Sequence, residues 1–184
     1  MRVFAPGKLV VIGEYAVLQG APAVVAAIDR GVRCTVSTGD EIETPGDDRF
    51  VRAGLLAVEA PARRYLFRDS VQWPYPEKPG LGGSAAAVVA ACAAGLSARG
   101  ESWDDLLEIS AAAHFSVQGS GSGLDVRASV EGGLRRLHGG LDVLAKRVRD
   151  GLLHEFYGQH ASGKDHVPGP VESGLHLAPG IEPG

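Results

Sequence analysis

A glycine-rich turn that leads directly into a run of small residues constrains this chain more than any other stretch. Residues 80–91 are Gly-Leu-Gly-Gly-Ser-Ala-Ala-Ala-Val-Val-Ala-Ala. Three glycines in four positions allow backbone angles that other residues avoid and let a ligand approach the main chain closely. Ser84 stands where a helix N-cap is expected, and the alanines after it favour a helix. We expect this helix to run to about Arg99, with Gly100 as its C′ residue, and to form the buried centre of the fold.

The start of that helix favours one kind of chemistry. The first N–H groups of a helix have no partner within it, and no bulky side chain precedes them here. Such a helix start binds anions, most often phosphate. The alternative is an ordinary loop-to-helix junction with close helix packing, because a single glycine-rich loop is a weak signal.

Length, charge and cysteine content indicate an ordinary globular protein. The 184 residues are enough for one domain with a sizeable core, or for one domain and a tail. The net charge of −4 argues against a nucleic-acid partner, and no apolar run is long enough for a membrane span. Cys34 and Cys92, in a chain that starts without a secretory signal, are expected to be buried free thiols in the cytoplasm.

The first third of the chain has the pattern of several strands joined by glycine turns. Residues 9–12, Leu-Val-Val-Ile, predict a buried strand. Residues 23–28 form a second apolar run, and residues 32–37 alternate between apolar and polar, as in a strand with one solvated face. The acidic, turn-rich residues 39–48 are expected to form a surface loop.

Three further helices are predicted. A short helix over 49–60 should end at Pro61, and a helical segment over 126–131 should end at the two glycines that follow it. Between them, Ser102 and Asp105 have the spacing of a capping box at the start of another helix. His114 lies on that helix, where a buried histidine with satisfied hydrogen bonds is a commoner role than a catalytic one.

Three segments, each with a glycine turn, carry a group that suits phosphate chemistry: Lys8, Ser84 and Asp125. Phosphoryl transfer needs donors and a cation around the phosphates, an oxygen ligand for Mg²⁺, and a carboxylate that orients or deprotonates the attacking group. The alternatives are a solvated lysine at a strand edge and an aspartate that only caps a helix. Neither a Walker sequence nor the protein-kinase signatures are present, so a nucleotide fold of another type is expected.

A family resemblance joins these segments. Residues 5–8 and 13–18 are Ala-Pro-Gly-Lys and Gly-Glu-Tyr-Ala-Val-Leu, residues 80–86 form the glycine loop, and residues 121–126 are Gly-Ser-Gly-Leu-Asp-Val. In this order they resemble three motifs of the GHMP kinases, the superfamily of galactokinase, homoserine kinase, mevalonate kinase and phosphomevalonate kinase. The resemblance implies an α+β fold, like the second domain of ribosomal protein S5, with a mixed sheet and helices packed on one face.

Within the superfamily the resemblance is greatest to the phosphomevalonate kinases. Tyr15 stands where mevalonate kinases usually have histidine, and His114 lies near the position of their magnesium-binding glutamate. The resemblance implies that ATP, with Mg²⁺, phosphorylates a small acceptor, phosphomevalonate, in the mevalonate route to isoprenoids. Mevalonate kinase and a non-catalytic nucleotide-binding remnant are the alternatives.

The resemblance also implies roles for single residues. Asp125 would be the base or orienting charge, Lys8 would offset charge at the reacting centre, and Ser84 would reach Mg²⁺. Acceptor positioning would fall to Glu14, Tyr15 and Ser122. The ATP phosphates would be bound by the whole second motif: Gly80, Leu81, Gly82, Gly83, Ser84, Ala85 and Ala86.

The chain departs from the family pattern in its loop and after residue 133. Gly83 replaces the first of two serines that are usual in the second motif, and the spacer before the loop is short. No third glycine-rich motif of a C-terminal domain is found in residues 134–184. We therefore expect the N-terminal domain over 1–137, an amphipathic helix over 138–157, and a glycine- and proline-rich disordered tail over 158–184, for which a shifted reading frame or truncation is one explanation.

Overall fold

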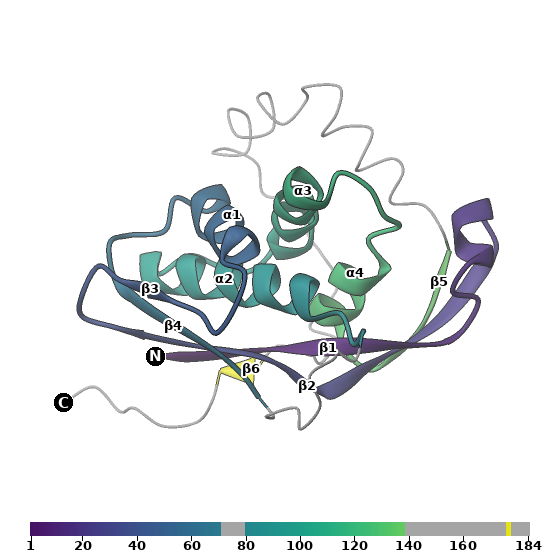
Figure 1. Ribbon diagram of the computed structural model, residues 1–184, viewed down its shortest axis with the longest axis horizontal. Coiled ribbons are helices and arrows are strands. Elements are labelled where there is room, and N and C mark those ends of the chain that lie inside the picture. Colours follow the sequence, from purple (N-terminus) through teal and green to yellow (C-terminus); the bar gives the residue numbers. More distant parts are fainter. Residues whose placement is uncertain (71–79, 139–175, 178–184) are drawn as a thin grey trace.

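The computed structural model describes residues 1–70, 80–138 and 176–177. These residues form the expected α+β fold, in which one mixed sheet carries the α-helices on one face (Figure 1). The predicted helix over 138–157 and the predicted tail over 158–184 lie outside the described residues, apart from His138 and the pair 176–177. The elements are β1 (Arg2–Ile12), η1 (Ala16–Gln19), β2 (Pro22–Ser37), β3 (Ile42–Glu43), α1 (Arg49–Ala57), β4 (Arg64–Asp69), α2 (Gly83–Arg99), α3 (Leu106–Gln118), α4 (Leu124–Glu131), β5 (Leu134–His138) and β6 (His176–Leu177).

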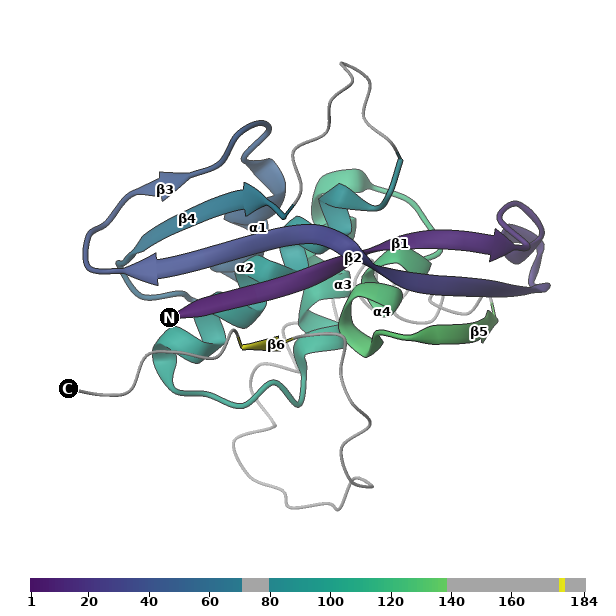
Figure 2. The same ribbon diagram turned by 90° about the horizontal axis from the view of Figure 1, so that it is seen from below.

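The long strand β2 organises the sheet. The strand order is β3-β4-β2-β1-β6, and β5 also pairs with β2, beside the half that β4 leaves free. Only β3 and β4 run parallel, and the other pairs are antiparallel (Figure 2). The two predicted strands over 23–28 and 32–37 are therefore one continuous strand. At Gly31 it passes so close to β1 that an added Cβ would lie 2.0 Å from the Ala5 carbonyl oxygen.

The prediction that residues 9–12 are buried is wrong, because helices cover only one face of the sheet. Leu9 pairs with Ala26, which in turn pairs with Leu134 of β5, so their side chains share the helix-free face. Leu9, Ile12 and Leu134 are 50%, 67% and 68% exposed. Val10 turns to the other face and packs in a small core with α4. Residues 9–11 thus alternate between the two faces, and Ile12, where the pairing of β1 with β2 shifts register, is exposed as well.

Helix α2 is the buried centre of the fold, as predicted. Its side chains from Ala85 to Leu96 are buried except that of Ala87, and the helix packs on β1, β2, α1 and α3. Small residues make this packing possible, since a Cβ added to Gly54 of α1 would lie 2.8 Å from the Ala91 Cβ. Gly100 ends the helix in the left-handed conformation with φ of 76°, which confirms the predicted C-terminus.

The other helices occur where they were expected, with shifted ends. Helix α1 begins at Arg49 as predicted but ends at Ala57, three residues before the predicted end, and α4 begins at Leu124, two residues before the predicted segment. The predicted capping box is wrong: α3 has Asp105 as its N-cap without a side-chain cap, and the Ser102 hydroxyl donates to Asp104 instead. The local hydrogen bond between the side chains of Ser102 and Asp104 takes the place of the predicted cap at Ser102. In the part of the chain that the structure describes, no helix has the length and apolar character needed to cross a bilayer.

Both cysteines are free and buried, as predicted. Burial raises the pKa of the Cys34 thiol to about 12, and it does the same for Cys92. Both side chains therefore stay protonated at neutral pH and behave as small apolar groups.

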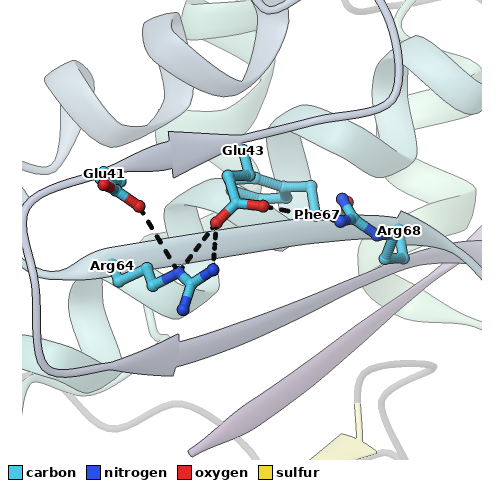
Figure 3. Close-up of polar contacts among 5 residues, drawn as sticks. All are labelled: Glu41, Glu43, Arg64, Phe67 and Arg68. Atoms are coloured by element: carbon cyan, nitrogen blue, oxygen red, sulfur yellow. Dashed lines mark hydrogen bonds and ion pairs between the residues drawn. The ribbon is translucent and has the colours of Figure 1, made fainter.

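The predicted surface loop over 39–48 contains the two-residue strand β3, which is fixed to β4 by charged side chains (Figure 3). Glu43 accepts from the Arg64 Nε at 2.8 Å and lies 3.6 Å from the Arg68 guanidinium. The hydrogen bond from Arg64 is the largest of the effects that lower the pKa of Glu43. Because these groups are solvated, the cluster sets the register of a short edge strand more than it adds stability.

Candidate functional site

The glycine loop forms the start of α2 with glycine in the left-handed conformation. Gly80 and Gly82 have φ of 66° and 74°, and Gly82 is the N-cap of the helix. The prediction that Ser84 is the N-cap is therefore wrong. Ser84 is the second residue of the helix, because the chain enters α2 through a backbone conformation that glycine adopts without strain and serine does not. Because Ser84 is not the N-cap, its hydroxyl does not cap the backbone N–H groups of α2 and is available to groups outside the helix.

The loop lies directly on the first motif in β1. The Lys8 backbone N–H donates to the Leu81 carbonyl oxygen at 2.9 Å. A Cβ added to Gly82 would lie 2.8 Å from the Lys8 Cγ, and one added to Gly7 would lie 2.5 Å from the Leu81 oxygen. Glycines at positions 7 and 82 thus permit this approach, and the stem of the Lys8 side chain runs beside the start of α2.

The space before α2 suits a phosphate group. Among the described residues, none has an atom within 4 Å of a Cβ added to Gly80 or Gly83, and both glycines are exposed. The first N–H groups of α2 lack intrahelical partners and carry the positive end of the helix dipole. The half-buried Ser84 hydroxyl adds the oxygen ligand type that Mg²⁺ prefers. Donors, room and one oxygen ligand therefore fit a magnesium–triphosphate group.

Ser84 on α2 contacts His114 on α3, and Asp125 on α4 acts electrostatically on the same histidine. His114 on α3 is only 5% exposed, and its Nε2 lies 3.3 Å from the Ser84 Oγ on α2. Burial lowers the pKa of His114, and the Asp125 carboxylate on α4 opposes this by raising it. The ring therefore has its neutral form at pH 7. The expectation of a buried histidine is confirmed, and the structure adds the connection to Ser84.

One buried hydrogen bond fixes α4 beside the first motif. The Ser129 hydroxyl, which is fully buried, donates to the Pro6 carbonyl oxygen at 2.7 Å. Asp125 is the second residue of the same helix, and its Oδ1 accepts from the backbone N–H of Val126 at 3.0 Å. The aspartate is thus held at a helix start whose position relative to Lys8 is set by the core.

The remaining predicted site residues lie on loops. Glu14 and Tyr15 follow β1, and Tyr15 is 79% exposed; Ser122 is half-buried in the loop before α4. Their part in acceptor positioning stays a prediction. Within residues 1–70 and 80–138, no three His, Cys, Asp or Glu side chains are grouped so that they could hold a metal ion.

Sequence reasoning missed the connection between His114 and Ser84, although one signal pointed to it. Ser110 and His114 are polar residues one turn apart in a helix whose middle is otherwise alanine-rich and apolar. Both are buried, so a polar stripe faces the interior of the helix layer. Such a stripe indicates a buried polar neighbour from another element.

The fold agrees with comparisons to known proteins. Residues 56–133 match the family model described as the GHMP kinases N terminal domain. The mevalonate kinase of Aeropyrum pernix is 31% identical over 158 residues, which cover 72% of this chain and 49% of that protein. The mevalonate kinase of Archaeoglobus fulgidus is 33% identical over 154 residues, with 72% and 51% covered.

Solved structures show the same architecture. The phosphomevalonate kinase of Streptococcus pneumoniae superposes with a TM-score of 0.66 at 21% identity, over 84% of this chain and 53% of that one. The mevalonate kinase of Methanococcus jannaschii gives a TM-score of 0.60 at 18% identity, over 70% and 50% of the two chains. The chain spans about half the length of the curated relatives it matches. It belongs, through its N-terminal domain, to the GHMP kinase superfamily.

Proposed function

We propose that this chain binds ATP with Mg²⁺ at the start of α2 and serves in phosphoryl transfer to phosphomevalonate. The observation that supports it most is that the glycine loop lies against Lys8 and that Ser84, at the same open helix start, contacts His114, on which Asp125 acts electrostatically. Family membership supports the same class of reaction. The structure and the relatives support a kinase-type N-terminal domain, whereas the choice of phosphomevalonate as the phosphate acceptor is our proposal.

The proposed roles follow from the positions of the groups. The backbone N–H groups from Gly82 onwards bind the phosphates, and the Lys8 ammonium offsets charge that develops during transfer. Magnesium, when bound, neutralises phosphate charge, with the Ser84 oxygen as its protein ligand. Asp125, in the first turn of α4 and electrostatically linked to His114, orients the acceptor group or takes its proton.

Two residues favour phosphomevalonate over mevalonate as the acceptor. Tyr15 and His114 occupy positions where the mevalonate kinase motifs usually have histidine and glutamate, as the sequence resemblance indicates. Mevalonate kinase is the second candidate, because the curated relatives quoted above have that name at 31% and 33% identity. A cytoplasmic location is part of the same proposal, since ATP and reduced thiols are available there.

A second class of function rests on the length of the chain. It spans about half of its curated relatives, so a nucleotide-binding module that needs further protein to close over the acceptor is the alternative to a self-sufficient enzyme. Binding of Mg²⁺ and ATP is common to both classes, and turnover separates them.

A coupled ADP-release assay with mevalonate, phosphomevalonate and galactose tests the proposal. We expect ADP release with phosphomevalonate and none above background with galactose, which controls for ATP hydrolysis. Release with mevalonate alone would replace the proposed acceptor by the second candidate. Magnesium-dependent ATP binding without release on any acceptor would identify a binding module, and absence of ATP binding would contradict both classes.

A further inference from the structure

The imidazole of His114 lies directly behind the hydroxyl that the proposed function assigns to magnesium. Its Nε2 is 3.3 Å from the Ser84 Oγ, and the ring is almost completely buried. The ring of Phe50, from α1, packs against it with a centroid distance of 5.3 Å and an interplanar angle of 31°. The imidazole therefore has a fixed place between α1 and the start of α2.

The direction of this hydrogen bond decides what Ser84 can do. A serine hydroxyl has one proton and two lone pairs. If the hydroxyl donates to Nε2, both lone pairs remain for a cation in front of α2. If Nε2–H donates to the hydroxyl, one lone pair is used and only one remains for a cation, beside the hydroxyl proton. The first arrangement therefore makes Ser84 the better metal ligand.

We infer that His114 is a positioning residue, whose Nε2 accepts the Ser84 hydroxyl proton and turns the oxygen lone pairs of Ser84 towards a nucleotide-bound cation. The imidazole then carries its own proton on Nδ1. This inference rests on the proposed function, because it gives Ser84 its cation from bound nucleotide. It gives His114 a role through Ser84, without contact to the nucleotide.

Two substitutions distinguish the effect of the hydrogen-bond acceptor at His114 from the effect of its packed ring. His114→Phe keeps a ring beside Phe50 and removes the acceptor, whereas His114→Gln places an amide oxygen near the former position of Nε2. We expect His114→Phe to weaken binding of a non-hydrolysable ATP analogue with Mg²⁺ by about tenfold, as does Ser84→Ala, because one buried hydrogen bond is lost. His114→Gln should retain most of the affinity. Isothermal titration calorimetry measures each value.

A double-mutant cycle shows whether His114 acts through Ser84. If it does, the double variant His114→Phe with Ser84→Ala binds the magnesium–nucleotide no more weakly than Ser84→Ala alone. The same variants should bind nucleotide equally when EDTA removes the cation. A purely structural role predicts instead that the two losses multiply and that both persist in EDTA, and this result would overturn the inference.

The outcomes distinguish this inference from the proposed function. Wild-type protein that binds no magnesium–nucleotide contradicts the proposed function and the inference with it, whereas binding that His114→Phe leaves unchanged contradicts the inference alone. If His114→Phe lowers the melting temperature so far that binding cannot be measured, His114→Asn, whose shorter amide does not reach the Nε2 position, takes its place. Nitrogen NMR of wild-type His114 gives an independent test, since a proton on Nε2 would contradict the assigned hydrogen-bond direction.

Discussion

Asp125→Asn is expected to lower phosphomevalonate-dependent ADP release by about 10²- to 10⁴-fold, the usual contribution of a general base. The amide keeps the size of the side chain, and its oxygen can still accept the Val126 N–H that Asp125 accepts now. What is lost is the negative charge and the ability to take a proton. Steady-state turnover and magnesium–nucleotide affinity, measured on the same sample, check this result.

The matched control is Asp105→Asn. Asp105 is also an aspartate at a helix start, but it is exposed, and it makes no side-chain cap on α3. Both variants lose the same favourable interaction with a helix dipole, about 0.3–1 kcal/mol. Turnover should therefore fall only in Asp125→Asn, with similar unfolding midpoints for the two. Equal turnover in the two variants would remove Asp125 from the proposed reaction.

Gly54→Val is expected to destabilise the domain by about 2–3 kcal/mol, because it forces apart the two helices at the centre of the fold. An added Cβ would lie 2.8 Å from the Ala91 Cβ and 2.9 Å from the Val88 carbonyl oxygen. The second of these is a backbone atom of α2, so no side-chain rotation relieves the clash. Urea denaturation, followed by circular dichroism, measures the change in the unfolding midpoint.

Gly46→Val is the control for a valine that replaces glycine elsewhere. No residue in the described part of the chain has an atom within 4 Å of a Cβ added at Gly46, so we expect a change within about 0.5 kcal/mol, as is usual at the surface. If the two variants unfold at the same urea concentration, α1 does not pack on α2 as closely as the structure shows.

Local sequence signals predicted the helix layer well. The alanine run with glycine at both ends predicted α2 and its C-terminus at Gly100. Such signals depend on backbone propensity and on residues a few positions apart, which the sequence displays directly. The order of the three family motifs then supplied the fold class.

The errors occurred where a distant segment decides the outcome. Residues 9–12 are apolar, yet their exposure depends on which face the helices cover. The start of α2 depends on the approach of Gly82 to Lys8, 74 positions earlier in the chain, and not on the cap preference of serine. Local propensity indicates neither the exposure of residues 9–12 nor the approach of Gly82 to Lys8.

Single residues of the candidate site could be predicted from the sequence, but the hydrogen bonds that join its elements could not. Lys8, Ser84 and Asp125 could each be selected from a glycine turn and a residue type. The hydrogen bond from Ser129 to Pro6 spans 123 positions, and that between Ser84 and His114 spans 30. These contacts arise only when α3 and α4 pack against α2 and β1, so the sequence pattern alone does not contain them.

In the proposed function, main-chain N–H groups at the start of α2 bind the phosphates of ATP. Amide NMR spectra of the ¹⁵N-labelled chain, titrated with a non-hydrolysable ATP analogue and Mg²⁺, test this claim. We predict that the largest shift changes fall on the amides of residues 80–86. Saturable binding that leaves those amides unmoved, with the largest changes elsewhere in the domain, would contradict the claim.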